Sequence, residues 1–358
     1  DTGFRKSHEA FAFHYAQGHV LAEHDFVFGD GNTANEAGDN PNQWDHGTYI
    51  WGTSGGHMDG KIYGPAYEAN FILCKTEDIR SETPVEEDNW VAAVEFADSV
   101  GADVITSSLT YSAWYTYSDY DGQTATITIA ANTADSLGIV VCNAMGNSGP
   151  SVGTLTPPAD AFDIIAVGAV TSLGSIASFS SRGPTFDGRP KPEVVAQGVS
   201  TYASSAAGDA AYTNVSGTSL STPLVAGLCC LVLEANPCLT PQQVREAVMM
   251  TADRAANPDS TTYGHGIPDA LAAINYASCP PPPCCVGTTG NINGDPGDIV
   301  DVADLTTLID HLFISFTPLG CPEEGNVNGD PNGDVDVADL TSLIDHLFIS
   351  FTPTAACQ

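Results

Sequence analysis

Basic side chains are scarce in this sequence, and long apolar runs are missing from it. Lys and Arg together number 10, against 44 Asp and Glu, which gives a formal net charge of −34. Because so acidic a chain is repelled by a phosphate backbone, nucleic acid is not expected as a partner. No continuous apolar run reaches the roughly 18 residues that a membrane span needs, so no membrane span is expected. The chain opens on Asp1-Thr2-Gly3 rather than on a basic and then apolar stretch, so no signal peptide is expected within it.

Acidic side chains and cysteines are, by contrast, plentiful. Calcium prefers carboxylate oxygens and is therefore a more suitable partner than nucleic acid. Solubility, or growth in salt, is the alternative explanation of the acidity in the body of the chain. Five of the ten cysteines lie late in the chain, at positions 279, 284, 285, 321 and 357, beside a proline-rich stretch. This pattern indicates disulfides and an oxidising compartment outside the cell.

Residues 1–277 alternate between strand-like and helix-like segments. The sequence predicts strands at residues 71–75, 104–107, 139–142, 164–167 and 193–196, and helices at 88–100, 220–234, 241–252 and 268–274. Residues 123–137 are rich in Thr and Ile, which favour strands, but their place between two strands predicts a crossover helix. Alternation of this kind predicts an α/β fold with a parallel sheet flanked by helices.

The composition changes near residue 278. Residues 278–289 are rich in Cys and Pro, and the four consecutive prolines favour an extended, semi-rigid linker. Residues 290–358 then form a second predicted domain, because residues 291–318 and 326–353 match almost residue for residue. A duplication of that length is not a chance event.

Three motifs in the first domain carry chemistry. They are Asp1-Thr2-Gly3, the segment around His46 at 45–48 (DHGT), and residues 214–227 (NVSGTSLSTPLVAG). In the third motif, small residues lead into an apolar helical run, which puts Ser219 at a helix N-terminus, where free N–H groups favour developing negative charge. A nucleophilic serine needs a neighbouring base, and that base needs a group that orients it.

Asp, His and Ser in this chain order form one of the known arrangements of a catalytic triad, and the sequence resembles the subtilisin-like serine peptidases, or subtilases, over roughly residues 1–277. The resemblance implies that Asp1, His46 and Ser219 are the triad, that Asn147 in the segment 143–150 donates to the oxyanion, and that the substrate is a protein or peptide. It implies no cofactor for the chemistry. The other histidines outside the repeats (His8, His14, His19, His24, His57 and His265) are interpreted as ordinary polar residues.

The same resemblance implies a substrate-binding edge that pairs with the substrate as an added strand. The expected substrate-binding residues are Ser107, Ser108, Leu109, Thr110, Ala144, Met145 and Gly146. Met145 and Thr110 stand where smaller residues are usual in the family, and the bulky segment 49–51 follows the histidine motif. These departures are expected to alter specificity and to leave the chemistry intact.

The start of the chain also departs from the family pattern. In subtilases, an apolar central strand leads into the catalytic Asp, and nothing in this sequence precedes Asp1. We therefore expect the chain to be a fragment of a longer precursor that supplies this strand and a propeptide. Two functions are compatible with the sequence: a secreted serine endopeptidase, or a catalytically inactive subtilase-fold binding protein attached to a cohesin-type scaffold.

The repeats of residues 290–358 place oxygen side chains at alternate positions before an amphipathic helix. The predicted calcium ligands are Asn291, Asn293, Asp295, Asp301 and Asp304 in the first repeat, and Asn326, Asn328, Asp330, Asp336 and Asp339 in the second. The repeats resemble dockerin modules, which are small all-α domains of two loop–helix units; the resemblance implies calcium and a possible cohesin partner. A calcium-stabilised cap is the alternative.

Two further features of the repeats lead to predictions about their packing. The stripe of Val302, Leu305, Ile309 and Leu312, with its second copy of Val337, Leu340, Ile344 and Leu347, is predicted to pack the two repeats together. Cys321 and Cys357 close the two repeats at similar places. They are predicted to act as staples for a module too small to be stable by its core alone.

Overall fold

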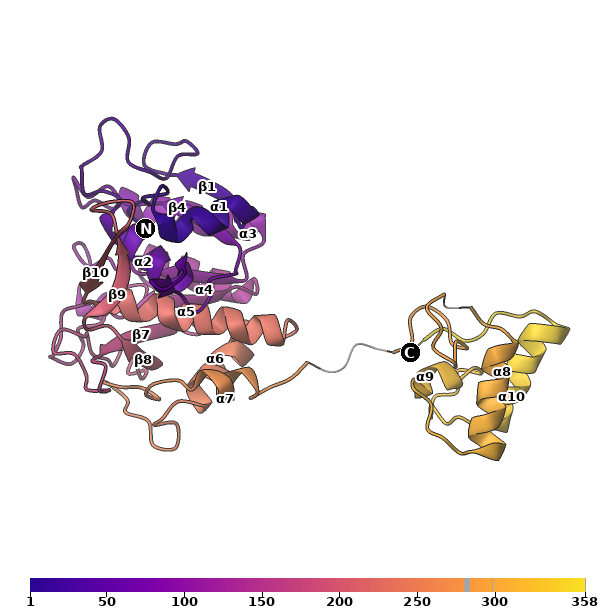
Figure 1. Cartoon of the computed structure of the whole chain (residues 1–358). Coiled ribbons are helices and arrows are strands. Elements are labelled where there is room, and N and C mark those ends of the chain that lie inside the picture. Colours follow the sequence, from indigo (N-terminus) through magenta and orange to yellow (C-terminus); the bar gives the residue numbers. More distant parts are fainter. Residues whose placement is uncertain (280–283, 298, 358) are drawn as a thin grey trace. The chain divides into compact units, whose positions relative to one another are not determined.

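A computed structural model describes residues 1–279, 284–297 and 299–357. The chain divides into two compact units, Asp1–Cys279 and Pro280–Gln358, and each is described here by itself (Figure 1). The four consecutive prolines of the predicted linker, at 280–283, lie outside the described residues. A disulfide between Cys238 and Cys279 fastens the end of the first unit.

A four-stranded parallel sheet forms the centre of the first unit. Its order is β5 (Val104–Ser107), β6 (Val140–Ala144), β7 (Ile165–Val170) and β8 (Val194–Gln197). Every residue of β6 and β7 is buried, as the apolar composition of these runs requires of strands that are covered on both faces. The four strands predicted here from sequence are confirmed to within a few residues.

Helices cover both faces of this sheet. On one face, α5 (Thr218–Ala235), α6 (Pro241–Met250) and α7 (Ala270–Ile274) pack on side chains of β6, β7 and β8. On the other face lie α3 (Val85–Val100) and α4 (Thr126–Ser136). The Thr- and Ile-rich segment is thus a helix, as predicted, and its buried residues Ile127, Ala131 and Ala134 recur at helical spacing.

Helix α5 has the length and mean composition of a membrane span, although Ser and Thr interrupt its apolar residues. Its 18 residues have a mean hydropathy of 1.5. In the structure, however, 67% of this window is buried inside the first unit, where the helix contacts strands β5 to β8. We therefore assign α5 as a core helix.

The remaining elements of the first unit lie around its N-terminal half. Helices α1 (Ala12–Gln17) and α2 (Asp45–Gly55) accompany strands β1 (Val20–Asp25) and β4 (Phe71–Lys75), which form a separate parallel pair. Two short antiparallel pairs are β2 (His57–Met58) with β3 (Ile62–Tyr63), and β9 (Thr201–Ser205) with β10 (Ala211–Val215). Two short 3-10 helices, η1 (Glu9–Phe11) and η2 (Tyr117–Asp119), complete the described elements. The predicted strand at 71–75 is confirmed, but its partner β1 was not predicted.

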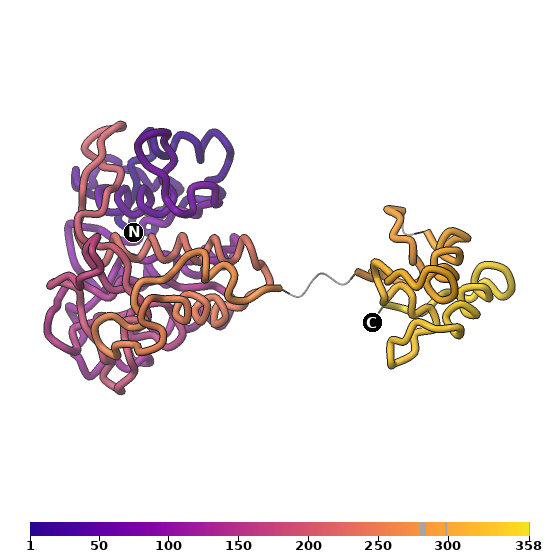
Figure 2. Tube along the Cα trace, turned by 60° about the horizontal axis from the view of Figure 1, so that its bottom comes forward, coloured from indigo at the N-terminus to yellow at the C-terminus, as the bar shows by residue number. Residues whose placement is uncertain are grey.

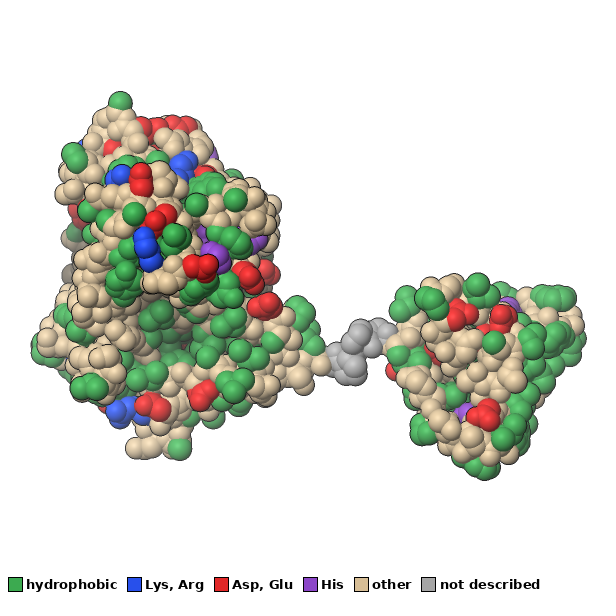
Figure 3. All heavy atoms as spheres, viewed as in Figure 1, with side chains coloured by type: hydrophobic (Ala, Val, Ile, Leu, Met, Phe, Trp, Pro, Cys, Tyr) green, Lys and Arg blue, Asp and Glu red, His purple; other side chains and the backbone are tan. Residues whose placement is uncertain are grey.

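A cavity of about 520 Å³ separates β4 from β5. It is lined by both strands and by apolar side chains of α3 and α5, such as Val94 and Leu233. Asp1 stands at one end: its ammonium donates to the carbonyl oxygen of Cys74 at 3.0 Å, and its own carbonyl accepts from Thr76 N at 2.9 Å. Asp1 therefore pairs with the end of β4 as a parallel strand does. Figure 1 shows the N-terminus close to β4, and Figure 2 shows it among the indigo and purple segments of the first part of the chain. Figure 3 shows a hollow lined by hydrophobic side chains on this unit.

The second unit contains two copies of a loop followed by a helix. Helix α8 (Val302–Ile309) continues into a π-helical turn, η3 (Asp310–Ile314), and α10 (Val337–Ile344) continues into η4 (Asp345–Ile349); the short α9 (Pro322–Gly325) joins the repeats. Helices α8 and α10 contact each other (Figure 1). The disulfides Cys284–Cys321 and Cys285–Cys357 confirm that Cys321 and Cys357 both cross-link the second unit, as predicted.

The core of the second unit corrects the predicted stripe. Leu308 and Leu343 are fully buried, together with Ile292 and Val327, and the flanking leucines of each helix pack against them. Val302 and Val337, which were predicted to face this core, are more than half exposed. The apolar face of each helix therefore centres on Leu308 or Leu343, near the end of the helix, and not on the neighbouring isoleucine of the predicted stripe.

Candidate active site

Asp1 and His46 meet at the end of β4 and the start of α2. Asp1 Oδ1 lies 2.8 Å from His46 Nδ1 and also accepts a hydrogen bond from Thr2 N at 2.6 Å. Because a carboxylate only accepts, Nδ1 of His46 carries the proton, which leaves Nε2 free to act as a base. The pairing predicted from the two separate motifs is present in the structure.

Ser219 lies in the first turn of α5, next to the end of β5. Its hydroxyl donates to the carbonyl oxygen of Ser108 at 3.3 Å, and the hydroxyl of Ser108 donates to the carbonyl oxygen of Ser219 at 2.9 Å. No hydrogen bond joins Ser219 to His46 among the described residues. Catalytic hydrogen bonds are often long before substrate binds, so this geometry is compatible with a resting enzyme.

Asn147 is held by the residue that precedes the serine. Its Oδ1 accepts from Thr218 N at 2.9 Å and from Thr218 Oγ1 at 3.1 Å. With the oxygen fixed in this way, the amide donor Nδ2 is oriented for a ligand beside the N-terminus of α5. The role of Thr218 as a clamp was not predicted, and its only signal in the sequence is its place beside Ser219.

A lowered pKa keeps the imidazole of His46 neutral, although 33% of the side chain is exposed. Burial lowers the pKa of His46 to about 4; the α-ammonium of Asp1 acts in the same direction, and Glu77 opposes both. The Asp1 carboxylate at 2.8 Å also opposes the lowering, because an anion favours imidazolium. A neutral imidazole at neutral pH is the protonation state that a general base requires.

Two buried polar side chains near Asp1 and His46, those of Glu77 and Gln43, were not predicted from sequence. Glu77 follows β4, accepts a hydrogen bond from the hydroxyl of Tyr111, and has its pKa raised by burial to about 7. Gln43 is fully buried; its Nε2 donates to Thr2 O at 2.8 Å and to Glu77 O, and its Oε1 accepts from Ile79 N at 3.0 Å. One side chain therefore joins the N-terminus, the segment before α2 and the segment after β4.

The predicted substrate-binding residues lie at the ends of β5 and β6. Ser107 ends β5, and its Oγ accepts from Trp90 Nε1 at 3.0 Å; Ser108 contacts Ser219. The predicted substrate-binding residues Leu109, Thr110, Ala144 and Gly146 follow in the same two segments. Met145 is fully buried and packs against Leu155, so its side chain faces the core and not the surface.

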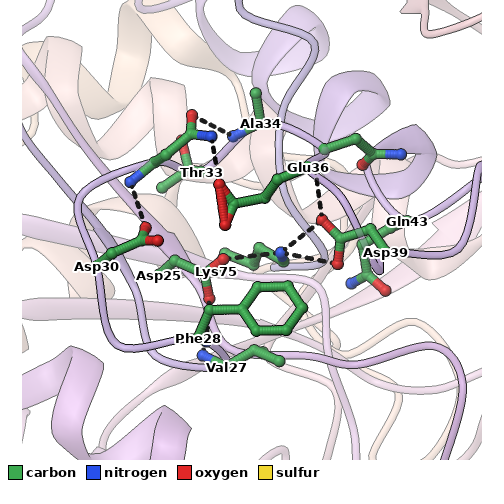
Figure 4. Close-up of polar contacts among 12 residues, drawn as sticks. Asp25, Val27, Phe28, Asp30, Thr33, Ala34, Glu36, Asp39, Gln43 and Lys75 are labelled. Carbon is green, nitrogen blue, oxygen red and sulfur yellow. Dashed lines mark hydrogen bonds and ion pairs between the residues drawn. The ribbon is translucent and has the colours of Figure 1, made fainter.

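An ion cluster fixes the loop between β1 and α2. The ammonium of Lys75, fully buried at the end of β4, lies 2.7 Å from the carboxylate of Asp25 and 3.0 Å from that of Asp39 (Figure 4). Asp25, Asp30 and Glu36 also bring their carboxylates within 4.8 Å of one another. Lys75 already neutralises Asp25, so we interpret the cluster as structural and not as a metal site. It fixes Lys75 at the end of β4, beside Thr76, whose N–H group donates to the carbonyl oxygen of Asp1.

The predicted calcium ligands of the second unit gather around each loop. In the first repeat, Asp295 N donates to Oδ1 of Asn291 and Asn293 at 3.0 and 2.8 Å, and Asn293 N donates to Asp304 at 2.9 Å. The second repeat has the same bonds among Asn326, Asn328, Asp330 and Asp339. Asp301 and Asp336 are the N-caps of α8 and α10, with Asp304 and Asp339 completing each capping box.

Asp304 and Asp339 fit a bound cation. Both are fully buried, and each accepts hydrogen bonds from two backbone N–H groups of the described residues. Residues 280–358 contain no Lys or Arg that would neutralise them. A buried carboxylate needs a compensating positive charge, and oxygen-rich loops of this kind suit calcium.

Comparison with known proteins agrees with this geometry. The sequence model of the subtilase family matches residues 1–266. The chain is 32% identical over 266 residues to serine protease AprX of Bacillus subtilis (strain 168), covering 64% of this chain and 57% of AprX. It is 33% identical over 275 residues to subtilisin DY of Bacillus licheniformis, covering 76% of this chain and 88% of that protein. The chain thus spans little more than half the length of AprX.

Solved structures share the fold of the first unit. A cold adapted subtilisin-like serine proteinase superposes with a TM-score of 0.57 at 26% identity, covering 75% of this chain and 84% of that one. The self-cleaved protease domain of PatA has a TM-score of 0.55 at 21% identity, covering 65% and 84% of the two chains, and this likeness concerns the fold alone. With the family match over residues 1–266, these findings show that the chain belongs to the subtilase family.

Proposed function

We propose that the protein is a secreted serine endopeptidase that hydrolyses peptide bonds through Asp1, His46 and Ser219. The observation that carries the proposal is the arrangement of the catalytic groups: Asp1 orients the neutral imidazole of His46, and Ser219 stands at the N-terminus of α5. Membership of the subtilase family supports it. The three disulfides among the described residues support an extracellular location.

The proposed reaction follows from these positions. The hydroxyl of Ser219 leaves the carbonyl of Ser108, gives its proton to Nε2 of His46 and attacks the substrate carbonyl carbon. Asp1 stabilises the imidazolium, while Asn147 Nδ2 and Ser219 N donate to the oxyanion. His46 then protonates the leaving amine, and water, activated by His46, hydrolyses the acyl-enzyme. In this proposal the segment 107–110 pairs with the extended substrate, and 144–146 borders the pocket for its side chain.

A catalytically inactive binding protein is the second candidate, because the serine hydroxyl bonds to Ser108 and not to His46. A fluorophosphonate probe separates the two functions. We expect covalent labelling at Ser219, with no labelling of the Ser219→Ala variant. Absence of labelling in the calcium-loaded chain, both as given and extended upstream of Asp1, would exclude the peptidase and leave the binding protein.

We further propose that a strand leading into Asp1 fills the cavity between β4 and β5. The parallel pairing of Asp1 with the end of β4, and the apolar walls of the cavity, support a strand in this place. Extending the chain upstream with an apolar strand is expected to raise both the melting temperature and the labelling rate. An extension rich in Lys and Glu is the matched control and is expected to raise neither.

We propose that each repeat of the second unit binds one calcium ion. Bound calcium would neutralise the buried carboxylates of Asp304 and Asp339 and so stabilise the loops before α8 and α10. Titration calorimetry of the full chain should give two sites. Asp304→Asn and Asp339→Asn should each remove one of them; retention of both sites in the double variant would contradict the ligand assignment.

The repeats are also proposed to attach the enzyme to a scaffold, as their resemblance to dockerins suggests. The exposed apolar surface described below supports docking, and a calcium-stabilised cap remains the competing role. A pull-down of the Ser219→Ala protein with recombinant cohesin domains, with and without calcium, tests this. Calcium-dependent capture supports docking, and calcium binding without any capture supports the cap.

A further inference from the structure

The second unit presents the same exposed apolar cluster twice, at the end of each repeat helix. We call these the repeat-end clusters; their members are Phe313, Ile314 and Phe316 in the first repeat, and Phe348, Ile349 and Phe351 in the second. The members are 53%, 68% and 69% exposed in the first cluster and 55%, 68% and 70% in the second. Single exposed apolar residues are ordinary, but contiguous patches on a small domain mark interaction surfaces.

The backbone of each cluster is unusual in the same way. Each cluster begins in a π-helical turn, η3 or η4, and such turns are rare and concentrate at functional sites. Phe316 and Phe351 follow with φ angles of 55° and 57°, in the left-handed region that bulky side chains seldom adopt. Residues stay in such conformations where the surrounding structure holds them, most often at binding sites.

A hydrogen-bond network holds the first cluster in this conformation. Ser315 N and Phe316 N both donate to the carbonyl oxygen of Asp310, at 2.9 and 3.4 Å, and the Ser315 hydroxyl donates to the Asp310 carboxylate. His311 Nδ1 donates to the carbonyl oxygen of Thr317 at 2.7 Å. The phenyl ring of residue 316 is therefore carried by a braced turn, and little ordering is needed when a partner binds.

The second repeat reproduces this network bond for bond. Ser350 N and Phe351 N donate to the carbonyl oxygen of Asp345 at 2.9 and 3.3 Å, and the Ser350 hydroxyl donates to the Asp345 carboxylate. His346 Nδ1 donates to Thr352 O at 2.7 Å. Phe316 and Phe351 are 69% and 70% exposed and lie outside the core cluster of the unit, so a core requirement alone does not explain why their turns are braced.

The charge around the clusters indicates the chemistry of the partner. Residues 280–358 contain no Lys or Arg, whereas Asp310 and Asp345 lie beside the clusters. A second copy of the unit and an anionic lipid surface both carry the same sign of charge and are repelled. A protein groove that is apolar inside and flanked by Lys and Arg complements the surface in both respects.

We infer that the repeat-end clusters are the docking surface of the second unit, and that each inserts its braced phenylalanine, Phe316 or Phe351, into an apolar groove of a protein partner flanked by basic residues. The inference rests on the proposed docking function of this unit and names the contact surface. Because the two clusters are equivalent, either one can serve while the other stays free.

The test measures binding of the calcium-loaded, full-length Ser219→Ala protein to a panel of recombinant cohesin domains that differ in the charge of their exposed faces. We expect the most basic members to bind most tightly and their affinity to fall as salt rises. Phe316→Ala or Phe351→Ala alone should weaken binding by about twofold, and the double variant by at least about tenfold. The double Phe→Tyr variant should retain affinity, and Leu173→Ala, which removes an exposed leucine from the first unit, should have no effect.

Three results would overturn the inference. Binding that survives the double alanine variant, with melting temperature and calcium binding unchanged, would place the docking surface elsewhere on the unit. Equal binding to phosphatidylcholine vesicles would make the clusters a lipid-binding surface. Failure of the wild-type protein to bind any cohesin would remove the docking proposal too, while labelling of Ser219 would leave the peptidase proposal standing.

Discussion

Replacing Gln43 by methionine tests whether the hydrogen bond between Asp1 and His46 depends on a side chain that contacts neither residue by a hydrogen bond. Gln43→Met keeps the length and shape of the side chain and removes its three hydrogen bonds. The carbonyl groups of Thr2 and Glu77 and the N–H group of Ile79 then lose their partners in a buried place. The substitution therefore separates hydrogen bonding from packing.

The expected magnitudes follow from these contacts. Each lost hydrogen bond costs about 0.5–1.5 kcal/mol net, and more where a buried group is left unpaired, so the free energy of unfolding should fall by about 3 kcal/mol. Thr2 adjoins Asp1, so its movement displaces the carboxylate that orients His46. A displacement of about 1 Å reduces kcat by about 100-fold. KM should change little, because the side chain of Gln43 makes its hydrogen bonds to Thr2, Glu77 and Ile79 and not to the expected substrate-binding residues.

The assay combines urea unfolding with peptide hydrolysis and its pH profile in the same preparation. Gln17→Met, an exposed glutamine on α1, is the matched control and should behave as the wild type. If Gln43→Met loses stability but keeps the wild-type kcat and acid limb, Gln43 stabilises the fold without positioning the catalytic pair. If neither changes, the three hydrogen bonds contribute nothing measurable and the reasoning is refuted.

Three further predictions concern charge and cross-links. Because the pKa of His46 is lowered to about 4, the imidazole stays neutral until the pH falls to that value. The fall of kcat/KM on the acid side of the pH profile should therefore have its midpoint well below pH 6.5. A midpoint at pH 6.5 or above contradicts this. Lys75→Met leaves Asp25 buried and unpaired and should lower the free energy of unfolding by about 3–5 kcal/mol in urea titrations, whereas no loss would contradict its structural role. Replacing Cys238 and Cys279 by serine should lower it by about 2–4 kcal/mol without changing kcat, and a changed kcat would show that the cross-link reaches the active site.

The sequence predicted the sheet, most helices, the pairing of Asp1 with His46 and the place of Ser219 in the first turn of a helix, because each has a strong local signal. Strands β5 to β8 are short apolar runs between turn residues, and Ser219 stands at the entrance of a long apolar helix. The helix at α4 was predicted against its propensity, since the order of elements required a crossover. Local pattern and chain order together were sufficient for these features.

Other features depend on contacts between distant segments and had no local signal. Strand β1 mixes Leu, His, Glu and Asp, and only its parallel pairing with β4 makes it a strand. Gln43 is one of many polar residues in a loop until folding brings three backbone segments around it. The stripe on α8 was misplaced because helical periodicity gives the width of an apolar face but not its centre. Packing decides which of two neighbouring apolar residues enters the core, and here Leu308 enters it.

The two neighbouring cysteines at the start of the second unit have a mechanical consequence. Cys284 is bonded to Cys321, between the repeats, and Cys285 is bonded to Cys357, near the end of the chain. Tension applied between the linker and the C-terminus therefore passes directly through the Cys285–Cys357 bond. Both repeats lie inside that covalent loop and bear none of the load. A pull between these two points would therefore leave the predicted calcium loops folded, and chemical reduction would be needed before such a force could extend them.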